Sequence, residues 1–205
     1  RSYSVTGVQT CALPICLTIN AAITKSNKGD TVVVTEGTHT GGGTSVVTIN
    51  NKSVLLSGGW NAAFTSQTGT STIDGGGTRT GIEIFESNNV RIDRFSIRNG
   101  LGGISANRSD VIISNSSISG TIGDGIYNGI NSVLILNNSA VSDSKLHASG
   151  QANGIRNSGT LRINNSTISG NTNGYGIHIS GGTVILNNTT RSEEHTSELQ
   201  SPNTI

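Results

Sequence analysis

Charged side chains and aromatic rings are both scarce in this sequence. Asp, Glu, Lys and Arg together make up 12% of the 205 residues, and the formal net charge is +1; an average soluble domain has about 25% charged residues. So little charge argues against disorder driven by charge repulsion and against electrostatic binding to nucleic acid, which requires a basic surface. Aromatic residues, at 3%, are too few for an ordinary packed core of mixed helices and sheets. No apolar run approaches the ~18 residues of a membrane span.

Glycine, in contrast, is in excess. It accounts for 28 of the 205 residues, which is about twice the usual 7%. At roughly 100–200 residues per domain, a chain of this length corresponds to one domain or to part of one. Both prolines and both cysteines lie close to the termini, so the long middle of the chain is built without either residue type.

The two ends also differ in style from the middle. Residues 191–201 resemble the translation of a common short-read sequencing adapter, and residues 5–15 resemble the translation of its reverse complement. A match to both strands at both ends favours non-native flanks at residues 1–16 and 191–205 around a natural stretch, 17–190. The alternative is a genuine N-terminal segment and a polar C-terminal tail. We expect the flanks to make few core contacts, and we infer no disulfide from Cys11 and Cys16.

A repeat of about 22 residues organises the stretch between the flanks. Its first mark is a Gly-Ile pair, whose isoleucines lie 22, 22, 29 and 22 residues apart: Ile82, Ile104, Ile126, Ile155 and Ile177. Between these pairs come two alternating apolar residues, a polar turn and one further apolar residue, as in Val111, Ile113 and Ile118. Runs this short cannot form an independent strand pair. Copies stacked ~4.8 Å apart can instead form parallel sheets around a narrow apolar column.

An asparagine occupies the same place in the turn before the third apolar run of four copies: Asn115, Asn138, Asn165 and Asn188. Asparagine tolerates the left-handed backbone conformation, and its amide can bond to the amide on the next turn of the coil. We therefore predict an inward-pointing asparagine ladder. It should begin at Asn115, because Arg94 stands at this position in the preceding copy.

Together these features resemble the right-handed parallel β-helix proteins of the pectin-lyase-like superfamily, in particular those of bacterial secreted or surface type. Ala21–Ile23 followed by residues 29–34 resembles the family's entrance, which is a short capping helix and then the first turn. The resemblance implies an all-β fold: a right-handed, single-stranded parallel β-helix (solenoid) of about seven turns with a short N-terminal helix. An antiparallel β-sandwich is the alternative, but a sandwich has no reason to keep a constant repeat length.

In the enzymes of this superfamily, the polysaccharide lies along the outside of the sheet that here carries the Gly-Ile strands. We expect the outward row beside the isoleucines to contain Glu83, Ser105, Tyr127, Arg156 and His178. Inverting glycoside hydrolysis needs two carboxyl groups about 6.5–9.5 Å apart, and calcium-dependent elimination needs several carboxylates and a base. Glu83 is the one acidic residue of the row, so no catalytic or metal-binding residue of the family carries over to this sequence.

The candidate carbohydrate-binding residues are Tyr127, Arg156 and His178, with Glu83 further along the same row. A tyrosine ring offers a stacking face, a guanidinium group binds carboxylates and an imidazole bonds to hydroxyl groups. The alternative interpretation is an exposed sheet face whose residues only need to tolerate solvent.

The leading hypothesis is part of a secreted or cell-surface β-solenoid that acts as a rigid stalk or as an adhesive, glycan-contacting surface. Its expected partners are a polysaccharide or cell-surface glycan and a continuation of the same solenoid at both ends. We expect no nucleic acid, membrane span, metal or cofactor. The alternative is a truncated polysaccharide lyase or glycoside hydrolase whose catalytic turns lie outside this sequence. Enzymatic activity therefore stays open, and the missing carboxylate cluster favours a non-enzymatic role.

Overall fold

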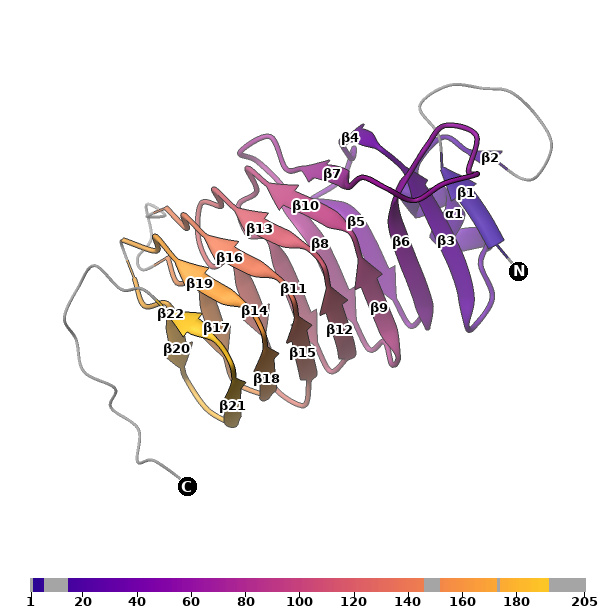
Figure 1. The fold of residues 1–205 in the computed structure, drawn as a ribbon. Coiled ribbons are helices and arrows are strands. Elements are labelled where there is room, and N and C mark those ends of the chain that lie inside the picture. The colour runs from indigo at the N-terminus through magenta and orange to yellow at the C-terminus, as the bar shows by residue number, and fades with distance from the viewer. Residues whose placement is uncertain (1, 6–14, 146–151, 173, 192–205) are drawn as a thin grey trace.

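The chain forms an elongated coil of short strands, with the N-terminal strands and helix at one end and the C-terminal strands at the other (Figure 1). The computed structural model describes residues 2–5, 15–145, 152–172 and 174–191. Within these residues the strands stack into three parallel sheets around a common core. The predicted all-β class, a parallel β-helix of about seven turns with a short N-terminal helix, is confirmed.

Each sheet collects one strand from successive turns of the coil, counted over the described residues. The nine-stranded sheet contains, in spatial order, β2 (Ile15–Cys16), β1 (Ser2–Val5), β3 (Asp30–Thr35), β6 (Val54–Trp60), β9 (Val90–Asp93), β12 (Asp110–Ser114), β15 (Val133–Asn137), β18 (Thr160–Asn164) and β21 (Thr183–Asn187). The seven-stranded sheet contains β22 (Thr190–Arg191), β19 (Thr167–Ser169), β16 (Ala140–Ser142), β13 (Ser117–Ser119), β10 (Phe95–Arg98), β7 (Ser71–Asp74) and β4 (Gly37–His39). The six-stranded sheet contains β20 (Ile177–Ile179), β17 (Ile155–Asn157), β14 (Ile126–Asn128), β11 (Ile104–Asn107), β8 (Thr80–Phe85) and β5 (Ser45–Asn50).

The isoleucines of the Gly-Ile pairs form a single file in the six-stranded sheet. Each is paired in register with the next: Ile82, Ile104, Ile126, Ile155 and Ile177. All five are buried in the core, so the predicted register is confirmed. The glycine before each isoleucine has a steric cause. A Cβ on Gly125 would lie 2.6 Å from the carbonyl oxygen of Gly154 on the next turn and 2.7 Å from Cγ1 of Val141, so no larger residue fits without displacing its neighbours.

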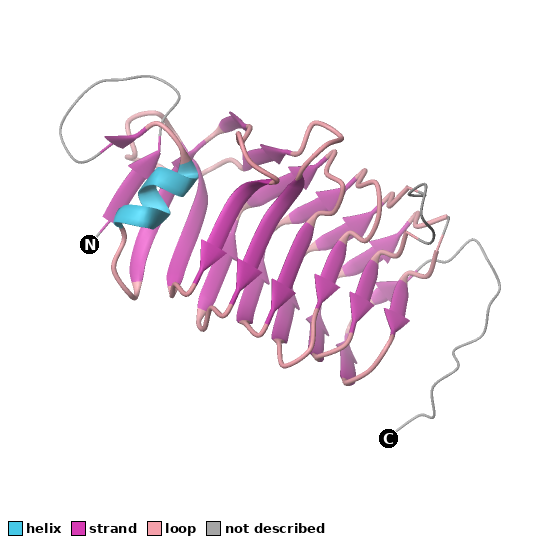
Figure 2. Cartoon of the chain, turned by 180° about the vertical axis from the view of Figure 1, so that it is seen from behind, coloured by secondary structure: helices cyan, strands magenta, loops and turns pink. Residues whose placement is uncertain are grey.

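A single helix, α1 (Ile19–Lys25), covers the N-terminal end of the coil (Figure 2). It begins at Thr18, whose hydroxyl accepts a 3.1 Å hydrogen bond from the backbone N–H of Ala21, as expected of a helix N-cap. Its apolar residues Ile19, Ala22 and Ile23 are buried. The helix thus shields the first turn from water, and the predicted capping helix is confirmed.

The turn asparagines have the predicted backbone conformation but the opposite orientation. The φ angles of Asn115, Asn138 and Asn165 are 50°, 48° and 48°, all left-handed. Their side chains are exposed, so the prediction that they point inward is wrong. The left-handed residue sends its own side chain out of the corner, and the following residue turns inward. The buried amide pair of the core is elsewhere, where Asn128 Nδ2 donates to Asn157 Oδ1 at 2.7 Å.

The inward positions of this corner are occupied by the serines that follow the asparagines. Ser116, Ser139 and Ser166 are all buried. The backbone N–H of Ser116 donates to Oγ of Ser139 at 3.1 Å, and that of Ser139 donates to Oγ of Ser166 at 3.1 Å. Each hydroxyl in turn donates to the carbonyl oxygen two residues earlier. This serine ladder pairs backbone groups that would otherwise be buried without partners.

The N-terminal flank contributes two strands, β1 and β2, contrary to our expectation. β1 pairs in parallel with β3, with Ser2 opposite Thr31 and Val5 opposite Val34. The edge of a sheet presents unpaired backbone groups, and a short extended segment satisfies them whatever its origin. The expectation of few contacts is therefore wrong for β1 and for β2, whose Cys16 is buried in the core, and Arg191 of the C-terminal flank pairs with Ile168. Residues 1, 6–14 and 192–205 lie outside the described residues, and the origin of both flanks stays a prediction.

Candidate functional site

The outward row of the six-stranded sheet has the order expected from the sequence. Tyr127 in β14 lies opposite Arg156 in β17, and Arg156 lies opposite His178 in β20. Glu83 in β8 belongs to the same row but is separated from Tyr127 by Ser105. The structure therefore places Tyr127, Arg156 and His178 on three adjacent strands, with Glu83 apart from them.

Glu83 is an exposed residue with its own local partner. Ser45 Oγ donates a long hydrogen bond of 3.4 Å to Glu83 Oε2. No hydrogen bond or ion pair among the described residues connects Glu83 to Tyr127, Arg156 or His178. We treat Glu83 as a neighbour of the site rather than as part of it.

The guanidinium group of Arg156 lies over the ring of Tyr127, with 4.6 Å between Cζ and the ring centroid. This is a cation–π contact, which stabilises the pair by roughly 0.5–1 kcal/mol at an exposed position. Its consequence for binding is steric, because one face of the Tyr127 ring is already covered. The expected stacking face of this ring is therefore limited to its other side, because the guanidinium group of Arg156 lies over this one.

Asp124 fixes the position of Arg156. Its Oδ2 forms an ion pair with Arg156 Nε at 2.7 Å, and its Oδ1 accepts hydrogen bonds from the backbone N–H of Asn153 at 3.1 Å and from Asn153 Nδ2 at 2.8 Å. The Asp124 side chain is 14% exposed, whereas that of Arg156 is 45% exposed. A largely buried carboxylate with both oxygens bonded holds a partly exposed guanidinium in one place.

His178 has an aromatic neighbour of its own in Tyr175. The two ring centroids are 5.4 Å apart and the planes are tilted by 42°. The backbone N–H of Tyr175 donates to Asn153 Oδ1 at 3.0 Å, which joins this pair to the Asp124 network. The Nδ1 atom of His178 is buried and has no hydrogen-bond partner within the part of the chain that the structure describes.

These six side chains form one surface, here called the Arg156 patch: Asp124, Tyr127, Asn153, Arg156, Tyr175 and His178. It arises from the same four-residue segment in three consecutive turns of the coil, residues 124–127, 153–156 and 175–178. In each segment one patch residue precedes the Gly-Ile pair and one follows it. The sequence interpretation took its candidate site residues only from the position after each isoleucine, so it missed half the patch. The residue before each glycine was the available signal.

Part of the Arg156 guanidinium group has no hydrogen-bond partner among the described residues. Asp124 engages Nε, and no hydrogen bond from a described residue engages the two terminal guanidinium nitrogens of Arg156. Two parallel N–H donors in one plane match a carboxylate bidentately. Among the described residues no group of three or more His, Cys, Asp or Glu side chains could hold a metal ion. The one described helix is too short and too polar to cross a membrane.

The fold and the patch define the class of protein as a parallel β-solenoid with a polar and aromatic outer surface. No family model matches the chain, and no curated protein matches it. Among solved structures, the chain is similar to the crystal structure of the pectin methylesterase from Aspergillus niger, with a TM-score of 0.41 and 13% sequence identity over 93% of this chain and 85% of that chain. At this level the similarity carries no inference about activity.

Proposed function

We propose that this protein is part of a secreted or cell-surface solenoid that contacts glycans, and that the Arg156 patch is its contact surface for acidic sugars. The observation that carries the proposal is the fixed guanidinium group of Arg156. It is held at Nε by the ion pair with Asp124 and lies over the Tyr127 ring, and no described residue hydrogen-bonds to its terminal nitrogens. A pre-positioned donor pair loses little side-chain entropy when it binds a carboxylate.

The surroundings of Arg156 support a sugar in particular. Tyr175 and His178, next to and within β20, add aromatic ring surface and the imidazole nitrogens beside Arg156. Glycan-binding sites combine such ring surfaces with planar hydrogen-bonding groups. The solenoid supplies a rigid frame, because each patch residue lies in or next to β14, β17 or β20. These three strands are paired with one another in a continuous parallel sheet. In this proposal the coil acts as a stalk that displays the patch.

The enzyme alternative requires paired carboxylates that the described rows do not bring together. Glu83 is separated from the patch, and Asp124 is engaged by hydrogen bonds from Asn153 at Oδ1 and by the ion pair with Arg156 at Oδ2. This arrangement favours binding over lysis or hydrolysis. We expect no release of reducing ends or unsaturated products when the protein is incubated with polygalacturonate, and measurable turnover would favour the enzyme instead.

Binding is tested by calorimetric titration of the full chain with a hexamer of galacturonate. We expect Arg156→Gln to weaken binding by about tenfold, which corresponds to about 1.4 kcal/mol. The matched control is Arg162→Gln, which removes the same charge from the exposed face of β18 in the nine-stranded sheet. An equal loss of affinity in both variants would show that binding depends only on the net charge of the protein. If the unmodified chain does not bind the hexamer, the proposal is overturned.

A further inference from the structure

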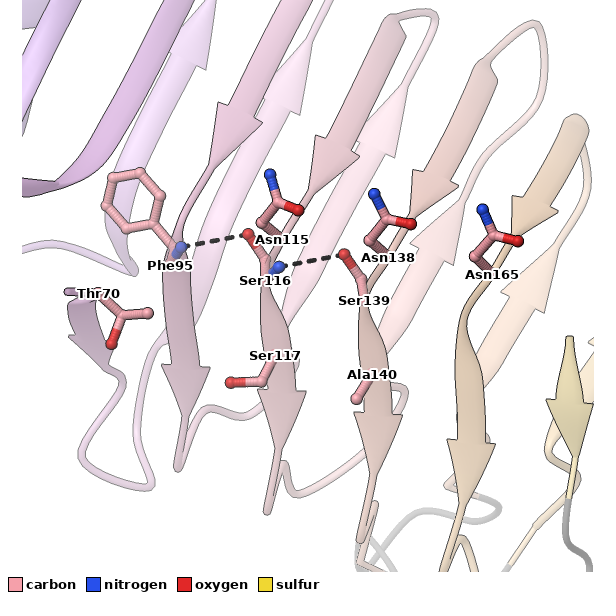
Figure 3. Close-up of a pocket in the computed structure, with 9 residues that line it drawn as sticks. All are labelled: Thr70, Phe95, Asn115, Ser116, Ser117, Asn138, Ser139, Ala140 and Asn165. Carbon is pink, nitrogen blue, oxygen red and sulfur yellow. Dashed lines mark hydrogen bonds between the residues drawn. The ribbon is translucent and has the colours of Figure 1, made fainter. Parts of the chain in front are cut away.

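A second polar surface runs along the corner between the nine-stranded and seven-stranded sheets, away from the Arg156 patch. It is a groove of about 590 Å³ whose rim is formed by Asn115, Asn138 and Asn165 (Figure 3). Ser117 and Ala140, at the starts of β13 and β16, line it from the side of the seven-stranded sheet. Because these residues come from successive turns of the coil, the groove lies parallel to the solenoid axis.

The rim is rigid and regular. The three asparagines share one left-handed backbone conformation, and in Figure 3 their side chains point the same way. The backbone N–H of Asn115 donates to the carbonyl oxygen of Asn137 at 3.1 Å, and that of Asn138 donates to the carbonyl oxygen of Asn164 at 3.1 Å. The rim amides therefore repeat at the strand spacing, ~4.8 Å. The buried serine ladder directly beneath holds this geometry in place.

Hydrogen-bonding groups of the rim remain unused within the described part of the chain. The Asn138 amide makes no hydrogen bond there. Asn165 accepts from Asn188 Nδ2 at 2.9 Å, which leaves its own Nδ2 available, and Asn115 donates to Asp93 Oδ1 at 2.7 Å, which leaves its Oδ1 available. The groove thus presents both donors and acceptors, and no charged side chain lines it.

We propose that this groove binds a neutral, extended polysaccharide chain that lies along the solenoid axis with one sugar ring for each turn of the coil. Each sugar hydroxyl both donates and accepts, as does each carboxamide of the rim. The strand spacing is close to the length of one pyranose ring measured along a 1,4-linked chain. No charged side chain lines the groove and the ligand is uncharged. Binding therefore does not remove water from an ionic group that has no partner of opposite charge.

This site is independent of the proposed function of the Arg156 patch, because it lies at a corner outside the six-stranded sheet that carries the patch and takes another class of glycan. Its probes are the 1,4-β-linked hexasaccharides of glucose, mannose and N-acetylglucosamine, titrated into the ¹⁵N-labelled full chain. We expect at least one of them to shift the side-chain amide resonances of Asn138 and Asn165 in a saturable way. The Asn138 resonance is assigned by its disappearance in Asn138→Gly.

The variant Asn138→Gly removes the amide and keeps the left-handed backbone, which glycine adopts without strain. We expect it to weaken hexasaccharide binding by about fivefold, the loss of about one net hydrogen bond. The matched control is Asn131→Gly, an exposed left-handed asparagine (φ 56°) between β14 and β15, where binding should be unchanged.

Several results would overturn the proposal. These are the absence of amide shifts with all three hexasaccharides, an equal loss of affinity in both glycine variants, or shifts caused by a neutral extended peptide but by none of the sugars. Arg156→Gln separates the two sites. It should leave hexasaccharide binding intact, and Asn138→Gly should leave galacturonate binding intact, so either proposal can fail alone.

Discussion

Ile112 and Ile113 are consecutive residues of β12 whose side chains leave opposite faces of the nine-stranded sheet. Ile113 is fully buried in the core, while Ile112 is half-buried in the outward row beside Arg91. We expect Ile113→Asp to destabilise the protein by more than about 4 kcal/mol, because an unpaired charge would be buried in the apolar column. Chemical denaturation followed by circular dichroism measures the change.

The matched variant is Ile112→Asp, which places the same side chain one residue away. It should cost about 1 kcal/mol or less, because its carboxylate reaches water and only strand preference is lost. Comparable damage from both substitutions would show that the alternation of faces described here is wrong.

Ser139→Ala tests the buried serine ladder. The substitution removes the acceptor of the Ser116 backbone N–H and the donor to the carbonyl oxygen of Asn137. Leaving a buried backbone group unpaired costs about 1–3 kcal/mol. Hydrogen exchange supplies a local readout, since the Ser116 amide should lose protection before the amides of the flanking strands β12 and β13.

The control for the ladder is Ser117→Ala in β13. Ser117 follows Ser116 in the chain, and its side chain lies outside the core. The Ser117 hydroxyl makes no hydrogen bond in the described part of the chain. Its replacement should leave both the melting temperature and the Ser116 exchange rate nearly unchanged. If Ser139→Ala and Ser117→Ala had the same melting temperature and the same Ser116 exchange rate, the serine ladder would not stabilise the protein.

Arg94→Asn should stabilise the protein. Arg94 has a φ angle of 60° at the corner where later turns carry asparagine. A left-handed conformation costs most L-residues about 1–2 kcal/mol, and asparagine pays less because its side chain bonds locally. The ion pair that would be lost, between Arg94 Nε and Asp93 Oδ2 at 3.6 Å, is partly exposed and contributes little. We expect a gain of about 1 kcal/mol in the free energy of unfolding.

The same substitution at Arg91, Arg91→Asn, separates backbone conformation from residue type. Arg91 lies within β9, where asparagine is unfavourable by up to about 1 kcal/mol. Stabilisation at Arg91, or its absence at Arg94, would contradict the explanation.

The core and the outward rows could be predicted from the sequence because a strand alternates strictly between two faces. Once the isoleucines were placed in one file, the residue after each of them had to face solvent, which located Tyr127, Arg156 and His178. The contact between Asp124 and Arg156 could not be predicted in this way. It joins residues on neighbouring turns through side-chain conformations, and the 29-residue repeat between these turns hides the correspondence.

The error at the turn asparagines has a different physical origin. The sequence shows that Asn115 needs a left-handed backbone, but the direction of a side chain at a corner depends on how the chain bends there. The corner turns Ser116 inward and leaves Asn115 exposed. The alternation of inward and outward side chains does not continue through such a bend. The sequence alone therefore does not show which corner residues point into the core and which point into solvent.

Asp74 should make stability depend on pH in acid. Its Oδ1 accepts from the backbone N–H of Gly76 at 2.9 Å, and its Oδ2 accepts from Asn99 Nδ2 at 3.1 Å and Arg98 Nε at 3.2 Å. These bonds, the Gly76 bond foremost, lower the pKa of Asp74 below its ordinary value against the opposing effect of partial burial. A lowered carboxyl pKa stabilises the fold above the unfolded value of about 4, and this stabilisation is lost as the pH falls through the folded value.

Asp74→Asn should therefore flatten the stability profile below about pH 4 and lower stability at neutral pH. Denaturation midpoints measured from pH 2 to pH 7 give the comparison. Asp110→Asn is the control, since that exposed carboxylate makes no hydrogen bond to a described residue. An unchanged acid limb in Asp74→Asn would show that the turn around Gly76 does not depend on the ionised carboxylate.

We propose that residues 17–190 form the natural unit, and a chain cut to these residues tests the proposal. The cut removes β1 and β2, including the buried Cys16, and uncovers the edge of β3, while α1 keeps its N-cap at Thr18. The two short strands and the one small buried side chain contribute about 4 kcal/mol at most after the entropy of ordering them. We expect a lower melting temperature and a transition that stays cooperative, with hydrogen-exchange protection retained in β12 and β15. Loss of cooperative unfolding, or recovery of the same flanking codons when the gene is sequenced from a library prepared without these adapters, would show that the flanks belong to the protein.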